Sequence, residues 1–146
     1  MKSLKFILLG MLLNASFLVK SDVAEVFSWK ANPGKTAEMI ENMAEAAGIQ
    51  RALGAHVTIN QLDVGSQQQV DYVIRFDSLE EWGASRDKLQ ASEEWNSFLA
   101  RIGSDPSGTL ELSFAAANLD PNTKSSSFPN SGVYGVWVWE VANGRL

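Results

Sequence analysis

Hydrophobic and polar residues alternate along four stretches of the chain, a pattern typical of strands that bury one face. The stretches are residues 24–30, 56–63, 70–76 and 109–116. Gly65 and Ser66 lie between the second and third stretches and predict a turn. We therefore expect these two strands to form a hairpin.

Two stretches between the strands carry hydrophobic residues at helical spacing. Residues 35–53 repeat apolar side chains at steps of three and four, and Gly54 follows as a stop signal. Ser78 and Glu81 have the spacing of a capping box, in which Glu81 reaches back to the serine amide, and so open a second helix. Ser92 is another candidate cap, so this helix should bend or restart there.

The resulting order, β-α-β-β-α-β, predicts an α+β, ferredoxin-like unit with an antiparallel sheet. Alternation divides the strand residues between two faces. The set expected to meet the helices is Phe27, Trp29, Val57, Ile59, Tyr72, Ile74, Phe76, Leu110, Leu112 and Phe114. The other face is mostly polar: Ser28, Lys30, His56, Thr58, Asn60, Asp71, Val73, Arg75, Glu111 and Ser113. Trp82, Trp95 and Phe98 have the spacing of core aromatics on the second helix.

The first 21 residues have the layout of a secretory signal peptide. Lys2 and Lys5 precede an apolar run at residues 6–19, and the small residue Ser21 follows. The run is shorter than the about twenty residues that span a bilayer. We expect residues 1–21 to be removed and the remainder to be exported, to the periplasm or outside the cell.

The charge and the composition narrow the classes of function. Loss of residues 1–21 removes three lysines and no acid, which changes the net charge from −5 to −8. A negative field repels nucleic acid and anionic lipid, so we expect neither as a partner. The chain has no cysteine and a single histidine, so we expect no disulfide, no metal site and no cofactor.

The C-terminal stretch repeats features of the first strand. With a shift of 110 residues, Trp137 and Trp139 stand opposite Phe27 and Trp29, and Gly144 opposite Gly34. Such a repeat predicts a second unit, and the alternative is a coincidental amphipathic strand. A sheet should pair or cover this strand, since an unpaired one invites aggregation.

Four segments therefore make up the expected organisation. Residues 1–21 are the signal peptide and 22–117 the ferredoxin-like unit. Residues 118–132 are polar, carry two prolines and predict a flexible linker. Residues 133–146 are expected to be the first strand of a truncated second repeat.

Three segments resemble the dimeric α+β barrel superfamily, in particular its NIPSNAP and antibiotic-biosynthesis-monooxygenase-like branch. They are FSWKANPGK (residues 27–35), RALGAHVTI (residues 51–59) and residues 76–102, with the spacing Ser-x-x-Trp-x-x-Phe in the second helix. The resemblance implies that two units, in two chains or in tandem, stack their sheets into one barrel. Relatives that bind haem do so through a helix histidine, and neither expected helix here carries one.

The polar sheet face supplies the candidate site. His56, Asn60, Asp71, Arg75 and Glu111 could line a pocket for a small polar or anionic ligand. The alternative is a solvated face with ordinary cross-strand ion pairs.

Two hypotheses for the function follow. One is an exported, non-catalytic or small-ligand-binding protein that pairs with a second copy or repeat. The other, which the resemblance suggests, is a cofactor-independent monooxygenase-like enzyme acting near His56, Asn60 and Arg75.

Overall fold

The computed structural model describes residues 22–62 and 69–120, together with 122, 124–128, 132–133, 135–137 and 141–142. Its elements follow the expected order: β1 (Val23–Ala31), α1 (Thr36–Ala52), β2 (His56–Gln61), β3 (Gln69–Phe76), α2 (Leu79–Ala91), α3 (Glu93–Ser104), β4 (Gly108–Ala117) and the short 3₁₀ helix η1 (Ser125–Ser127). The expected signal peptide and the Gly65–Ser66 turn lie outside the described residues.

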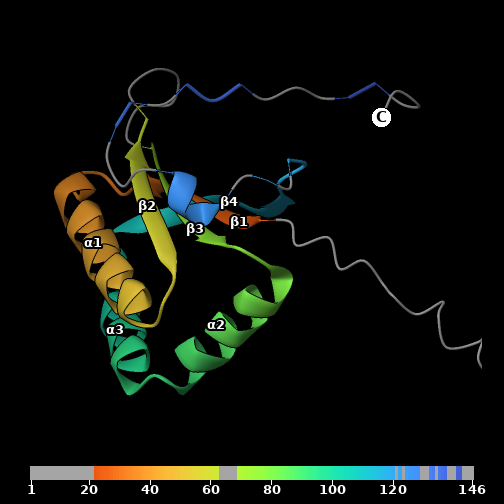
Figure 1. The fold of residues 1–146 in the computed structure, drawn as a ribbon. Coiled ribbons are helices and arrows are strands. Elements are labelled where there is room, and N and C mark those ends of the chain that lie inside the picture. The colour runs from red at the N-terminus through yellow and green to blue at the C-terminus, as the bar shows by residue number, and fades with distance from the viewer. Residues whose placement is uncertain are drawn as a thin grey trace, which may run out of the picture.

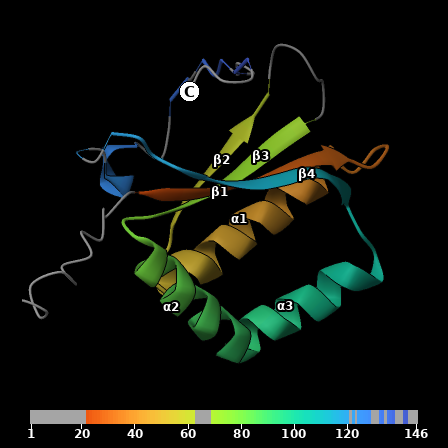
Figure 2. The ribbon, with the colours of Figure 1, turned by 90° about the vertical axis from the view of Figure 1, so that its right-hand side faces the viewer.

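The four strands form one antiparallel sheet in the order β2-β3-β1-β4. All three α-helices lie on one face of it, so the molecule has two layers (Figures 1 and 2). This arrangement confirms the predicted ferredoxin-like α+β fold. The opposite face of the sheet, which no α-helix covers, is called the open face below.

The second helical region divides at Ser92, as the sequence predicts. Ser78 caps α2 by accepting a hydrogen bond from the Glu81 amide at 3.1 Å, and Ser92 caps α3 by accepting one from the Trp95 amide at 3.2 Å. Glu81 was expected to reach back to the serine amide, and it accepts instead from the Asp77 amide. The two helices meet at an angle, with Ser92 between them in an extended conformation (Figure 2).

A β-bulge in β4 corrects the expected facing of that strand. The register with β1 shifts between Ser28 and Trp29, so Leu110 pairs with Trp29 while Leu112 pairs with Ser28. Directly paired residues point to the same side of a sheet. Leu112 and Phe114 were expected on the helix face, and they lie on the open face. Ser113 was expected on the open face, and it lies on the helix face.

The core lies between the sheet and α1. Its buried members include Met39, Met43, Ala47, Val57 and Ile74. Phe98 is the buried residue of α3, whereas Trp82 and Trp95 are only partly buried against this core. The three expected core aromatics thus all reach the core, but two of them stay at its margin.

Part of the predicted linker, residues 124–128, packs against the end of the sheet. After β4 the chain turns back, and η1 packs at the end of the sheet where β1 begins and β3 ends (Figure 2). Ser125, for which the sequence suggested only flexibility, is 7% exposed. Asp22 and Asp77, which lie just before β1 and just after β3, accept its hydrogen bonds, and a polar composition alone does not reveal such partners.

The described part of the C-terminal stretch belongs to no helix or strand. Val136 and Trp137 are 82% and 72% exposed. The remaining positions of the predicted repeat strand, Trp139 among them, lie outside the described residues, so the second repeat stays a prediction. No helix in the part of the chain that the structure describes is long and apolar enough to cross a bilayer.

Candidate functional site

A cavity of about 590 Å³ lies between the helix face of the sheet and the three α-helices. Its size falls within the range of small-molecule sites. The apolar side chains that line it are Phe27, Trp29, Met39, Met43, Tyr72, Ile74, Phe76, Leu89, Trp95, Phe98, Leu99 and Ile102.

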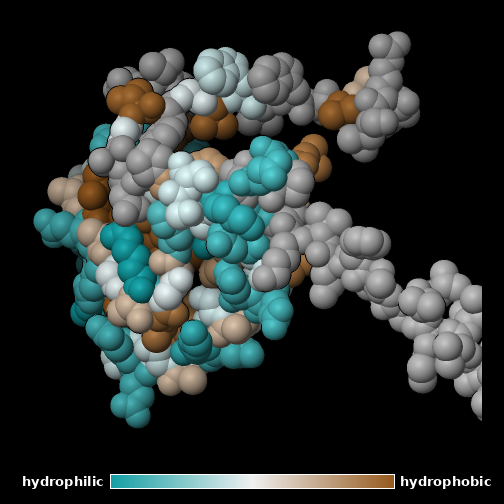
Figure 3. Space-filling view, viewed as in Figure 1, coloured by the Kyte–Doolittle hydropathy of each residue, from teal (hydrophilic) through white to brown (hydrophobic). Residues whose placement is uncertain are grey.

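The cavity exists because α2 stands away from the sheet. None of the α2 residues is buried, although Trp82 and Leu89 face inwards and are partly buried. The break at Ser92 sends α3 towards α1, which leaves room beneath α2 (Figure 2). In Figure 3 hydrophilic side chains spread over the outer surface of the helices, and hydrophobic ones show between them.

Aromatic rings form one wall of the cavity. Trp95 and Phe98 stack with their ring centroids 5.3 Å apart. Phe27, Trp29 and Trp95 pack against the core, are only partly buried, and border the cavity. Such rings offer flat apolar surface and favour aromatic or aliphatic ligand groups.

A buried hydrogen bond marks the α1 side of the cavity. The Tyr72 hydroxyl donates to Oε1 of Gln50 at 2.8 Å, and both side chains are buried. Burial raises the pKa of Tyr72 well above its ordinary value, because a phenolate would lose its hydration. Tyr72 therefore stays neutral near pH 7 and serves as a hydrogen-bonding group.

A charged pair joins α2 to the sheet. Arg86 of α2 forms an ion pair with Glu25 of β1, and both residues line the cavity. The Glu25 side chain is 9% exposed and that of Arg86 47% exposed. A buried carboxylate needs such a partner, so this pair helps to hold α2 over the cavity.

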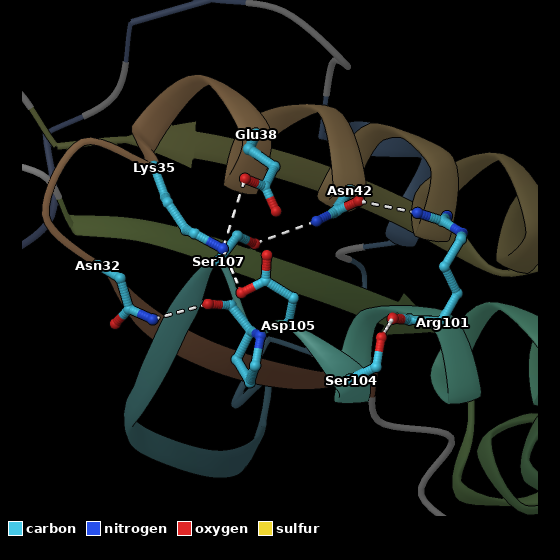
Figure 4. Close-up of polar contacts among 9 residues, drawn as sticks. Asn32, Lys35, Glu38, Asn42, Arg101, Ser104, Asp105 and Ser107 are labelled. Carbon is cyan, nitrogen blue, oxygen red and sulfur yellow. Dashed lines mark hydrogen bonds and ion pairs between the residues drawn. The ribbon is translucent and has the colours of Figure 1, made fainter.

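Polar contacts join α1, the end of α3 and the start of β4 at one end of the cavity (Figure 4). Asn42 donates to the Ser107 hydroxyl at 3.1 Å, and Lys35 reaches Asp105 at 2.5 Å. Arg101 forms an ion pair with Glu45 at 2.5 Å. At Gly108 a Cβ would lie 2.9 Å from the carbonyl oxygen of Lys30, a backbone atom of the paired strand, so glycine lets β4 pass this close to β1. These contacts fix the connection that leads from α3 into the sheet.

None of the five predicted site residues lines this cavity. His56 stands opposite Arg75 in the β2–β3 pairing, and Asn60 stands opposite Asp71. Asp71 accepts a hydrogen bond from Ser28 at 2.6 Å. Glu111 lies at the bulge of β4, on the far side of β1, so the structure brings together two pairs but not all five residues.

His56 and Arg75 both contact the segment that follows β4. Nε2 of His56 is 3.0 Å from the carbonyl oxygen of Phe128, and the Arg75 guanidinium lies 3.8 Å from the centre of the Phe128 ring. They also border a smaller hollow of about 330 Å³, which Asp77, Lys88 and Ser125 share. Across the described ranges, no three histidine or acidic side chains come close enough together to hold a metal ion.

Sequence reasoning missed Glu25 and Arg86. The signal was present in the sequence. Glu25 is two residues from Val23 and from Phe27, so it lies on the same face of the strand as these hydrophobic residues. A charge at a core position predicts either a partner or a functional site. Arg86 follows Trp82 by four residues, which places it on the same side of α2.

The model of the NIPSNAP family matches residues 24–106, more than half of the chain. The chain belongs to the NIPSNAP family. No curated protein matches it.

Solved structures of similar proteins share the fold. A NIPSNAP family protein of Agrobacterium tumefaciens is 22% identical, with a TM-score of 0.55 over 72% of this chain and 90% of that one. A NIPSNAP-like domain protein of Burkholderia xenovorans is 19% identical, with a TM-score of 0.55 over 80% and 97%. A Chloroflexus aurantiacus protein named for antibiotic biosynthesis monooxygenases is 17% identical, with a TM-score of 0.51 over 68% and 95%. At these identities the likeness shows the fold alone.

Proposed function

We propose that this NIPSNAP protein binds a small, mainly apolar molecule in the cavity beneath α2. The observation that carries the proposal is the cavity itself, about 590 Å³ in volume and bordered by partly buried aromatic rings. Removing apolar ligand surface from water contributes about 25 cal/mol per Å². The Glu25–Arg86 pair and the Gln50–Tyr72 hydrogen bond supply the few polar groups that orient a ligand in such sites.

Binding, and not catalysis, is the function that the arrangement supports best. The residues on which the enzyme hypothesis depends, His56, Asn60 and Arg75, lie on the strands of the open face and not around the cavity. Tyr72, the titratable phenol at the cavity wall, is held neutral and so is no general base near pH 7.

The neutral fluorescent probe N-phenyl-1-naphthylamine tests the proposal. We expect saturable fluorescence enhancement with the full chain. Replacement Ser85→Phe on α2, which adds a ring to the cavity wall, should weaken binding by about tenfold, equivalent to about 1.4 kcal/mol. Ser85 is a suitable position because α2 has no buried residue that the new ring would displace.

Ala91→Phe is the matched control, since Ala91 is exposed on the same helix and borders neither hollow. It should bind the probe as the wild type does. Absence of saturable binding by the wild type, or equal weakening by both variants with unchanged circular dichroism, would contradict the proposal.

We propose further that two copies pair through the open face. Leu112 and Phe114 are 55% and 48% exposed there, beside Val26 of β1. An exposed apolar surface of this kind is typical of interaction sites. The molar mass in solution over a concentration series tests the pairing.

We also propose that the protein acts after export. The support is the signal-peptide pattern of residues 1–21. N-terminal sequencing of the protein recovered from its native cells should begin at or near Asp22, and a chain that still begins at Met1 would contradict export by this route.

A further inference from the structure

Residues 124–128, called the docked segment below, are held on the sheet by four separate contacts. Ser125 donates its hydroxyl to Asp22 and its amide to Asp77, each at 2.9 Å. The other two contacts are those of Phe128 with His56 and Arg75. Asp22 and Ser125 are 3% and 7% exposed. These contacts join the docked segment to β2, β3 and the start of β1.

The ring of Phe128 occupies the open face. Arg75 lies opposite His56 and Ala24, and two residues from Val73, so its side chain projects from the face away from the helices. A ring stacked on the Arg75 guanidinium at 3.8 Å stands above the end of that face where β2 begins and β3 ends. The β1–β4 half, by contrast, leaves Leu112 and Phe114 exposed.

The dimensions of the sheet show why this position matters. Four strands about 4.8 Å apart and about eight residues long, at about 3.3 Å per residue, form a flat face of roughly 500 Å². A standard protein interface buries about 800 Å² of accessible surface on each partner, so pairing through a face this small draws on its whole extent and includes the end at His56 and Arg75. Stacked sheets lie only about 10 Å apart, which leaves no space for the Phe128 ring in its present place.

We propose that the docked segment and a second copy of the chain compete for the open face, so that release of the segment converts single chains into pairs. This inference rests on the pairing proposed above and adds how that pairing is regulated. The docked segment covers the end of the face where β2 begins and β3 ends while it is held by Asp22, Asp77, His56 and Arg75. When it is released, the whole face is free for the second copy.

Two kinds of variant of the full chain test the competition. Asp77→Ala with Phe128→Ala removes one anchor from the sheet and one from the segment, and leaves the trypsin site at Lys124 intact. Leu119→Ala is the matched control, because Leu119 lies on the same connection and is 96% exposed. Phe114→Glu, added to the double variant, places a charge on the half of the face that is already open.

The first measurement is the rate of tryptic cleavage after Lys124, which should rise at least fivefold in the double variant and stay unchanged in Leu119→Ala. The second is the association constant from sedimentation equilibrium. It should rise at least tenfold in the double variant and return to the wild-type value when Phe114→Glu is added.

Four results would overturn the competition. Unchanged cleavage in the double variant would show that these contacts do not hold the segment. Faster cleavage without stronger association would show that the docked segment does not limit pairing. Pairing of the wild type as strong as that of the double variant would show the same. Single chains at every concentration in all variants would remove the pairing as well, and probe binding in the cavity would still stand or fall separately.

Discussion

At the scale of single residues, two aspartates hold the docked segment by accepting hydrogen bonds from one serine. Asp22 takes the hydroxyl of Ser125, and Asp77 takes its amide. Hydrogen bonds to a carboxylate favour its charged form. The bonds from Ser125 accordingly lower the pKa of Asp77 below its ordinary value of 3.8.

This lowered pKa predicts a pH dependence of stability. A carboxyl group whose pKa is lower in the folded state stabilises that state above its unfolded pKa, and this contribution is lost as the pH falls through the folded pKa. The free energy of unfolding of the wild type should therefore exceed that of Asp77→Asn above about pH 5, with the difference shrinking below about pH 4.

Urea unfolding at a series of pH values measures this difference. Asp87→Asn, at an exposed position of α2, is the control for simple loss of a negative charge. A difference between wild type and Asp77→Asn that stays constant down to pH 2 would contradict the role assigned to the Asp77 carboxylate.

At the scale of elements, the break between α2 and α3 shapes the cavity. The Ser92 cap starts α3 in a new direction, and α3 then carries Trp95 and Phe98 to the cavity wall. A single continuous helix would run on in the direction of α2. The cap thus connects a local hydrogen bond with the volume of the candidate site.

Ser92→Ala should reduce the free energy of unfolding by about 1 kcal/mol, the usual effect of losing a serine cap. It should also weaken binding of N-phenyl-1-naphthylamine, because the start of α3 positions Trp95. Chemical unfolding and fluorescence titration measure the two effects.

Ser97→Ala makes the same substitution at an exposed position inside α3. Alanine has the higher helix propensity, so this control should lose no stability and bind the probe normally. Equal effects of the two substitutions would show that the cap does not position the cavity wall.

At the scale of the whole molecule, the two faces of the sheet have different proposed roles. The helix face borders a cavity suited to an apolar ligand, and the open face carries exposed Leu112 and Phe114 beside the docked segment. The β1 strand contributes to both, since Glu25, Phe27 and Trp29 border the cavity while Val26 lies beside Phe114 on the other side. Ligand binding and pairing are thus proposed for opposite sides of the same strands.

The sequence by itself determined the order of the elements, the ferredoxin-like fold and the break at Ser92. These features depend on local periodicity and on caps that span three residues, so they can be read from neighbouring positions. The resemblance carried by residues 27–35, 51–59 and 76–102 likewise indicated the family.

Only the tertiary structure decided where the candidate site lies. The bulge in β4 moved Leu112 and Phe114 to the open face, although strict alternation placed them against the helices. The cavity depends on the distance between α2 and the sheet, and the docked segment depends on contacts across 48 and 103 residues. Such features arise from packing between distant parts of the chain, which local periodicity does not encode.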